Sequence, residues 1–207
     1  DAAAAERLAA VLKALAEPTR LRLISLIAAH GAAGQACVYT TGWPSWVHVE
    51  NLAAWHNIPI GTKENGIAGM DTEFKVNSPL HVRQVTMLAD FAKKGLFTYA
   101  GRRNEGEAKF FSGECAMVTS SSAAQANIKR NAKFDFSVNF LPYHDDIKGA
   151  PQNSIIGGAS LWVMGGKTNN SYKGVAKFMA FLSQPELQAD WHQSTGYVPI
   201  TNAAAEL

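Results

Sequence analysis

The sequence predicts a layered α/β fold, and three observations support that fold class. Apolar runs of strand length alternate along the chain with longer segments that repeat apolar residues at helical spacing. The chain has 207 residues, enough to bury a sizeable core as one large domain or two small ones. Its composition, 47% hydrophobic and 17% charged, is typical of a globular protein and not of a disordered one.

Charge and apolar content exclude two classes of partner. The net charge of +2 is too balanced for a nucleic-acid-binding surface, so we expect no nucleic-acid partner. No apolar stretch approaches the roughly 18 residues of a membrane span, and the N-terminus lacks the pattern of a signal peptide. The two cysteines, Cys37 and Cys115, form either one disulfide or two buried thiols, and their number leaves both alternatives open.

Residues 1–33 are predicted to form a short helical leader, separate from the rest of the chain. Apolar residues recur at helical spacing over residues 8–15 in an alanine-rich segment. The stretch 13–23 resembles the opening helices of ArsR-type winged-helix regulators, and this resemblance covers about residues 4–30. In that family a later recognition helix enters the major groove, and no such helix follows here, so we expect no DNA binding.

Residues 34–207 form the second predicted domain, and residues that cap helices mark its elements. Ser78 and Pro79 favour a helix start, with the serine as N-cap and the proline in the first turn. Gly95 ends this helix, whose apolar face is formed by Val85, Leu88, Ala89 and Ala92. Further helices are predicted at about residues 44–56, 105–112, 120–130, 172–182 and 185–193.

The predicted strands are short apolar runs, beginning with residues 36–40 and 115–119. Phe134–Leu141 alternates apolar and polar residues, as a half-buried strand does. Leu161–Met164 is a continuous apolar run and is predicted to be a buried strand. The glycine pair at 157–158 precedes it and forms either a tight turn or a place where backbone N–H groups meet a small anion.

No recognisable catalytic or metal-binding motif occurs, so we expect no enzyme, no metal site and no cofactor. Gly165–Thr168 mimics the end of a phosphate-binding P-loop, but Leu161 stands where that motif needs a glycine, and a surface turn is favoured. The histidines show no metal-ligand spacing, and we expect His144, beside two aspartates, to be solvated surface. No serine lies in a Gly-x-Ser-x-Gly elbow.

Three features fit ligand binding, each with a structural alternative. Trp43 and Trp46 flank a proline turn, where indoles either join the core or cover the face of a polyol. Residues 120–122 are three serines at a helix start, which act as an ordinary N-cap or hold a phosphate or carboxylate. Tyr197 places a phenol on the turn 195–200, which is structural or a hydrogen-bond donor to ligand.

Six segments, taken in order and at their spacing, resemble the periplasmic glycerol-3-phosphate-binding proteins of Ugp-type ABC importers, in extracellular solute-binding protein family 1. They are Cys37–Trp43, Asp90–Arg102, Gly113–Met117, Pro151–Met164, Gly174–Phe178 and Trp191–Thr201. The resemblance covers about residues 34–207 and implies a partial periplasmic-binding-protein architecture of type II, mainly one lobe, after the helical leader. In that family two α/β lobes close on the ligand like a hinge.

The resemblance also implies a periplasmic location, a ligand, partners and site residues. The ligand is sn-glycerol 3-phosphate or a related glycerophosphodiester, and the partners are the ABC permease subunits of the importer. The implied ligand contacts are Trp43, Trp46, Ser121, Ser122, Gly158 and Tyr197. The family also uses first-lobe residues and a C-terminal arginine that we expect this chain to lack, so we expect impaired binding. The alternative function is an ArsR-type regulator fragment fused to a ligand-sensing segment.

Overall fold

A computed structural model describes residues 37–207, so the expected leader and the ArsR-like stretch lie outside the described residues. The internal contacts divide the chain into two compact units. Among the described residues, unit 1 comprises 37–120 and 131–155, and unit 2 comprises 121–130 and 156–207. The region expected to form mainly one lobe therefore contributes to two units, and each is described by itself.

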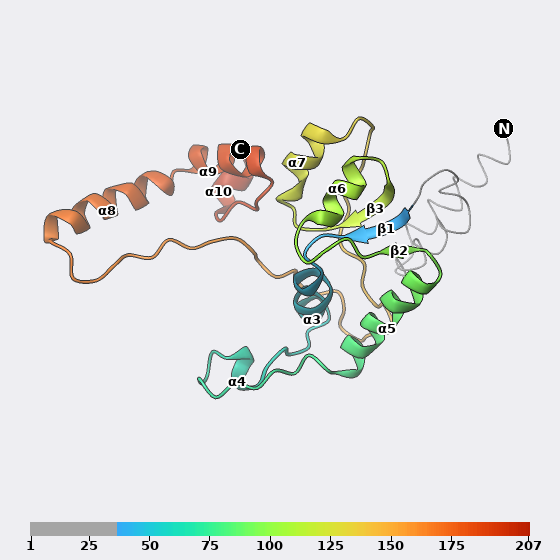
Figure 1. Ribbon diagram of the computed structural model, residues 1–207. Coiled ribbons are helices and arrows are strands. Elements are labelled where there is room, and N and C mark those ends of the chain that lie inside the picture. Colours follow the sequence, from blue (N-terminus) through green and yellow to red (C-terminus); the bar gives the residue numbers. More distant parts are fainter. Residues whose placement is uncertain (1–36) are drawn as a thin grey trace. The chain divides into compact units, whose positions relative to one another are not determined.

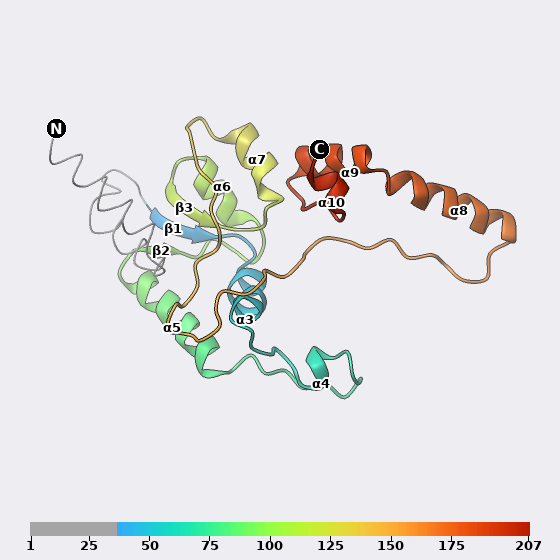
Figure 2. The ribbon, with the colours of Figure 1, turned by 180° about the vertical axis from the view of Figure 1, so that it is seen from behind.

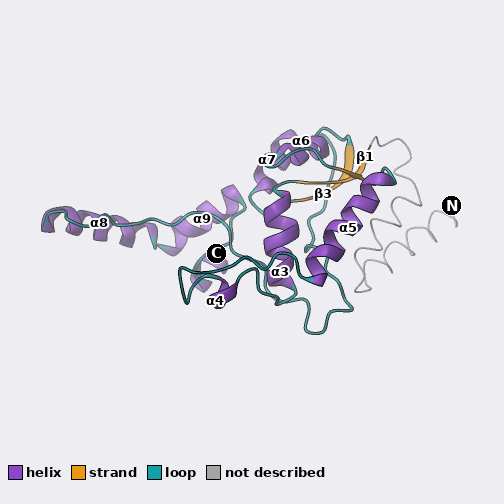
Figure 3. Ribbon diagram, turned by 60° about the horizontal axis from the view of Figure 1, so that its bottom comes forward, coloured by secondary structure: helices purple, strands orange, loops and turns teal. Residues whose placement is uncertain are grey.

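A three-stranded parallel sheet forms the centre of unit 1. Strand β1 (Cys37–Thr41) pairs with β2 (Phe97–Thr98) on one side and with β3 (Cys115–Thr119) on the other. Parallel neighbours need crossover connections, which helices provide here. Figures 1 and 3 show helices α5 (Pro79–Lys93) and α6 (Glu105–Phe111) on opposite sides of these strands. The expected α/β class is confirmed, and the structure shows that the sheet is parallel.

The structure decides between the two alternatives for the cysteines. Cys37 and Cys115 stand opposite each other in the β1–β3 register and form a disulfide. Both side chains are buried, with 2% and 1% of their surface exposed. The bond joins residues 78 positions apart in the chain, so it closes one large loop within unit 1.

The remaining elements of unit 1 follow the predicted order, apart from one short helix that was not predicted. The helix expected at 44–56 is a π-helical turn, η1 (Trp46–Glu50), continued by α3 (Asn51–Trp55). A short helix, α4 (Thr62–Asn65), precedes α5. Ser78 caps α5 by accepting a hydrogen bond from the His81 backbone N–H, as predicted.

The buried face of α5 differs from the prediction. Val85 is 56% exposed, whereas Leu80, His81 and Gln84 are buried. Leu88 alone of the expected apolar face packs against the core cluster of Tyr39 and Phe97, and only in part. Two polar side chains on the inner face were missed because helical periodicity was judged from apolar residues only.

Helix α6 lies close against the sheet because it carries a glycine. A Cβ at Gly106 would collide with the carbonyl oxygen of Thr41 on β1. The absence of a side chain therefore lets the helix backbone approach the strand backbone directly. Gly113, with φ of 81°, follows the helix in the left-handed conformation that glycine favours, as expected of a residue that ends a helix.

Unit 2 is helical. Its elements are α7 (Ala124–Asn131), α8 (Asn169–Leu182), α9 (Pro185–Thr195) and α10 (Asn202–Ala205). Figure 2 shows α9 and α10 packed against each other. Gly165–Thr168, which mimics the end of a P-loop, is a turn as predicted. Its last residue, Thr168, caps α8 by accepting a hydrogen bond from the Ser171 backbone N–H at 3.2 Å.

Two predicted strands are wrong. Residues 132–168 contain neither helix nor strand, and Figure 3 shows this run as loop. It includes both Phe134–Leu141 and Leu161–Met164, and Trp162 is 88% exposed. A strand needs a neighbour that completes its backbone hydrogen bonds, and the described chain offers none to either segment. Both segments have the apolar pattern of a strand, but that pattern alone does not provide a neighbouring strand to pair with.

We predict that the chain self-associates through unit 2. Its exposed apolar side chains include Trp162, Val163 and Met164, each at least half exposed. Burial of apolar surface between copies is favourable at about 25 cal/mol per Å². Light scattering should therefore report a mass that rises with concentration.

The variant Trp162→Ser with Met164→Ser should associate less. Val82→Ser, which removes a similarly exposed apolar side chain of unit 1, is the matched control. A clean monomer at high concentration would contradict this prediction.

We predict that the disulfide stabilises unit 1 substantially. Replacing Cys37 and Cys115 by alanine should lower the free energy of unfolding by about 4 kcal/mol, because a loop of this length gains much entropy when released. Urea unfolding followed by circular dichroism measures the change. The reduced and alkylated parent protein is a second sample without the disulfide. Equal urea midpoints for the oxidised parent, the reduced parent and the double alanine variant would count against the prediction.

Candidate ligand site

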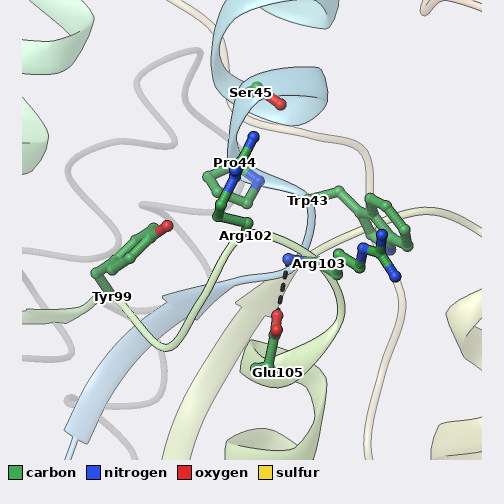
Figure 4. A pocket seen from close by; sticks show the side chains of 7 residues that line it. All are labelled: Trp43, Pro44, Ser45, Tyr99, Arg102, Arg103 and Glu105. Atoms are coloured by element: carbon green, nitrogen blue, oxygen red, sulfur yellow. Dashed lines mark hydrogen bonds between the residues drawn. The ribbon is translucent and has the colours of Figure 1, made fainter.

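An open pocket of ≈ 640 Å³ lies in unit 1 at the carboxyl ends of β1 and β2. Crevices at the carboxyl ends of parallel strands are the usual ligand sites of open α/β sheets. Figure 4 shows the side chains that line the pocket, which come from the loops that follow these two strands and from the first residues of the helices after those loops. They are Trp43, Pro44, Ser45, Tyr99, Arg102, Arg103 and Glu105.

The backbone around Trp43 is held in an uncommon conformation. Trp43 has φ of 49°, in the left-handed region that costs a non-glycine residue roughly 1–2 kcal/mol. Its N–H donates to the Arg103 carbonyl at 2.6 Å, and the Gly42 N–H donates to the Thr119 carbonyl at 2.9 Å. These bonds fix the loop so that the indole, 40% exposed, borders the pocket.

Of the two tryptophans expected at the site, the structure places one at the pocket. Trp46 lies in η1, is only partly exposed, and is not among the side chains that line the pocket. Tyr99, Arg102 and Arg103 line it instead, and sequence reasoning assigned none of them. The one signal that could have found them was a pair of adjacent arginines directly after Gly101, in a chain of modest charge.

The four other predicted site residues lie in unit 2, where three of them gather. Gly158 has φ of 120°, and a Cβ there would lie 3.8 Å from the Tyr197 ring. Gly196, next to Tyr197, packs so closely that its Cβ would lie 2.5 Å from the Ser122 carbonyl oxygen. Residues 122, 158 and 197 thus come together, through the close backbone approach of Gly196 to Ser122 and the ordinary contact distance between Gly158 and the Tyr197 ring.

Two polar groups of this cluster face solvent. Ser122 is exposed, whereas Ser121 is partly buried and accepts from the Ala123 N–H at 3.3 Å. Tyr197 is 40% exposed, and its hydroxyl has no hydrogen-bond partner among residues 37–207. Its position is fixed by the backbone, because the His192 imidazole donates to the Tyr197 carbonyl at 2.6 Å.

A buried chain of hydrogen bonds runs through unit 1 and was missed by sequence reasoning. The Gln84 amide donates to His48 Nδ1 at 3.0 Å, so the His48 Nε2–H donates to the Tyr39 hydroxyl at 3.0 Å. Tyr39 in turn donates to Thr119 Oγ1 at 2.7 Å. At the other end, the His144 Nε2–H donates to Gln84 Oε1 at 2.9 Å.

His144 is buried, so its expected place on a solvated surface is wrong. Its backbone N–H donates to the His56 imidazole at 2.8 Å, which fixes the loop against α3. Burial, together with the nearby positive charge of Arg83, lowers the pKa of His144 from 6.5 to about 4. Burial likewise lowers the pKa of His48 to about 4. Both imidazoles are therefore neutral at pH 7.

Two further findings concern metals and membranes. Within residues 37–207, no group of three or more His, Cys, Asp or Glu side chains is placed to hold a metal ion. None of the helices in the described part of the chain combines the length and apolarity needed to cross a membrane.

Comparison with known proteins gives one family and several relatives. The family model described as "Bacterial extracellular solute-binding protein" matches residues 3–207. The "sn-glycerol-3-phosphate-binding periplasmic protein UgpB" of Pectobacterium atrosepticum is 55% identical over 176 residues, and its counterparts in Yersinia enterocolitica and Salmonella typhimurium are 53% and 52% identical. Each match covers 85% of this chain but only 40% of the relative, so the chain spans about two fifths of their length.

A solved structure agrees in fold. The crystal structure of UgpB from Mycobacterium tuberculosis in complex with glycerophosphocholine superposes with a TM-score of 0.60 over 88% of this chain and 44% of that one. At 20% identity this likeness shows the fold alone, and it confirms the partial binding-protein architecture that the resemblance implied. The comparisons lend no support to the ArsR-type resemblance.

We predict that acid destabilises unit 1 through its buried histidines. The folded pKa values of His48 and His144 lie below the ordinary 6.5, so their contribution to stability is complete above pH 6.5. It is lost as the pH falls from about 6.5 to about 4, because the unfolded chain takes up protons first. Thermal unfolding measured across this range should show a steadily falling midpoint.

The variant His48→Gln should be less stable than the parent at pH 7. Its unfolding midpoint should nevertheless fall less than that of the parent when the pH is lowered. His192→Gln, a histidine of unit 2 outside this hydrogen-bond chain, is the control. If the unfolding midpoint of His48→Gln falls with pH as steeply as that of the parent, protonation of His48 does not cause the loss of stability in acid.

Proposed function

Because the chain belongs to the bacterial extracellular solute-binding protein family, we propose that it is the solute-binding component of an ABC importer. Its partners are then the permease subunits of that importer. The relatives are named as periplasmic proteins, and the proposed location of this chain is the periplasm. The disulfide between Cys37 and Cys115 is compatible with that location, since such bonds persist in oxidising compartments.

The proposed ligand is sn-glycerol 3-phosphate or a related glycerophosphodiester. The observation that carries this proposal is the cluster of Ser122, Gly158 and Tyr197, which are distant in sequence and meet in unit 2. Relatives at 52–55% identity carry glycerol 3-phosphate in their names, which supports the same ligand class. The solved relative is a complex with glycerophosphocholine, which is a glycerophosphodiester.

Each site residue has a proposed role. Trp43 and Trp46 cover the glycerol carbons with their indole faces, and Trp43 does so from the pocket of unit 1. Ser122, with Ser121 beside it, and the Gly158 backbone N–H hold polar oxygens of the ligand. The Tyr197 hydroxyl, which has no partner within residues 37–207, donates to a ligand oxygen.

The proposed role is binding and release, without catalysis. The family and the named relatives are solute-binding proteins. The alternative function, a fragment of an ArsR-type regulator, gains no support from the comparisons. The division between a leader, 1–33, and the following region stays a prediction, since the family match begins at residue 3 and spans both.

We predict that this chain binds sn-glycerol 3-phosphate more weakly than micromolar. It spans about two fifths of the relatives' length, and a small-ligand site normally encloses most of the ligand. Calorimetry on the 207-residue chain measures the affinity. A dissociation constant of micromolar or tighter would overturn the prediction of impaired binding.

Removing one hydroxyl should weaken the remaining affinity further. Tyr197→Phe loses one hydrogen bond to ligand, which corresponds to about a three- to tenfold weaker dissociation constant. Tyr143→Phe, which removes a hydroxyl from unit 1 outside the site, is the matched control. If both variants bind like the parent, Tyr197 is not a ligand contact.

A further inference from the structure

The segment 143–155, here called the strap, contains neither helix nor strand and is held within unit 1 by hydrogen bonds to two helices. On α3, the Gln152 N–H donates to the Trp55 carbonyl at 2.7 Å, and the Ile155 N–H donates to the Asn51 side-chain oxygen at 3.0 Å. These two bonds fix the C-terminal half of the strap. Residue 156, directly after it, belongs to unit 2.

The N-terminal half of the strap contacts α5. The His144 Nε2–H donates to Gln84 Oε1 at 2.9 Å, and both side chains are buried. Asp146 accepts two hydrogen bonds from Arg83 Nη1, at 2.6 and 2.9 Å. This ion pair is about half exposed, so water screens it and it holds the strap only weakly. The firm contact with α5 is therefore the buried one.

The remaining contact of the strap requires a neutral imidazole. His56 directly follows α3 and is buried, with 3% of its surface exposed. Its Nδ1 lies 2.8 Å from the Leu52 carbonyl oxygen, which can only accept, so Nδ1 carries the proton. Its Nε2 is then unprotonated and accepts the His144 backbone N–H at 2.8 Å. This bond forms only while His56 is uncharged.

Protonation affects the two imidazoles at the strap differently. A second proton on His56 has to sit on Nε2, so two N–H groups would face each other and the His144 N–H would lose its acceptor. The side chain of His144 would instead take a proton on Nδ1, which has no partner within residues 37–207. Its Nε2–H donates to Gln84 in both charge states. His56 is therefore the residue whose charge breaks a contact of the strap.

The titratable groups that face His56 come from the strap and from α5, since α3 carries none. The ring centres of Tyr143 and His144, on the strap, lie 6.5 and 5.5 Å from that of His56. Burial lowers the pKa of His56 from its ordinary 6.5, and the carbonyl bonded to Nδ1 opposes this shift. Arg83 on α5 lowers the pKa further, whereas Asp146 on the strap raises it. The held strap thus favours the neutral imidazole.

We propose that the strap is an acid-sensitive device, in which a proton on His56 releases residues 143–155 from α3 while the sheet of unit 1 stays folded. The His56 contact contributes fully above pH 6.5, where the released imidazole is neutral too. Its contribution falls as the pH drops below 6.5, because the released form takes up the proton first. The released population then rises by about tenfold for each pH unit. This inference goes beyond the proposed function, since it requires no ligand.

Amide hydrogen exchange on the 207-residue chain, followed by NMR from pH 7 to pH 5 well below the unfolding temperature, tests the proposal. The reporters are the strap amides of His144, Gln152 and Ile155, which donate to α3 or to His56. After correction for the intrinsic effect of pH, their protection should fall by about tenfold per pH unit below 6.5. The amides of Cys37 and Tyr39 in β1 should keep their protection.

The variant His56→Gln removes the titrating group, while its side-chain oxygen can still accept a hydrogen bond. Strap protection in this variant should change by less than about threefold over the same pH range. His192→Gln, which removes a histidine of unit 2, is the matched control and should behave like the parent. Circular dichroism establishes that each variant is folded.

Two results would overturn the proposal. If the strap and β1 amides of the parent lose protection in parallel, acid unfolds unit 1 as a whole and no separate release occurs. This comparison needs no variant, so it holds even if His56→Gln does not fold. If His56→Gln folds and its strap amides lose protection with acid as steeply as those of the parent, the proton acts at another group.

Discussion

The structure of unit 1 depends on the burial of strand β1 between two parallel neighbours. Its residues Tyr39, Thr40 and Thr41 carry hydroxyls, and all three are 0–2% exposed. A buried hydroxyl without a partner costs several kilocalories per mole, so each must be paired inside the protein. Thr40 donates to the Thr98 carbonyl at 2.9 Å, and Thr41 donates to the Gly42 carbonyl at 3.0 Å. The central strand therefore dictates which atoms its neighbours place against it.

The same requirement links the sheet to the helices and loops around it. Through Tyr39, the hydrogen bonds of β1 continue to His48 in η1 and then to Gln84 in α5. From Gln84 they reach His144, in the loop that follows residue 131. One connected set of polar side chains thus fixes η1, which directly follows the pocket loop, relative to the sheet. A hydrogen-bond network of this kind specifies one arrangement of these elements, because a shift of any one of them leaves several buried polar side chains without hydrogen-bond partners.

The sequence predicts the local elements well and the long-range pairing poorly. Capping residues such as Ser78 and Thr168 act on neighbouring backbone groups, and the helices they begin are where they were expected. The run Leu161–Met164 has the pattern of a core strand, but a strand is completed by a partner elsewhere in the chain. Burial of His144 likewise depends on Gln84, 60 residues away, and no local pattern reports it.

At the candidate site, too, local features were predicted and long-range contacts were not. Trp43 was found from its spacing to a proline turn, whereas Arg102 was overlooked although it lines the same pocket. The pair Arg102–Arg103 after Gly101 was a weak signal, since the sequence alone does not show which side chains lie around an arginine on a loop. Gly158 and Tyr197 were each named as site residues only through resemblance, and their proximity was not predicted, because 39 positions separate the two residues. Distance along the chain, more than residue type, limited what could be foreseen.

The close contact between Gly106 and Thr41 has an evolutionary consequence. No other amino acid fits at position 106 unless α6 moves away from β1, so this position tolerates no substitution without a compensating shift. Its neighbour Glu105 holds the loop that carries the two arginines. Substitution at this residue, which has no side chain, would therefore shift Glu105 and the pocket loop that Glu105 holds, although Gly106 itself does not line the pocket.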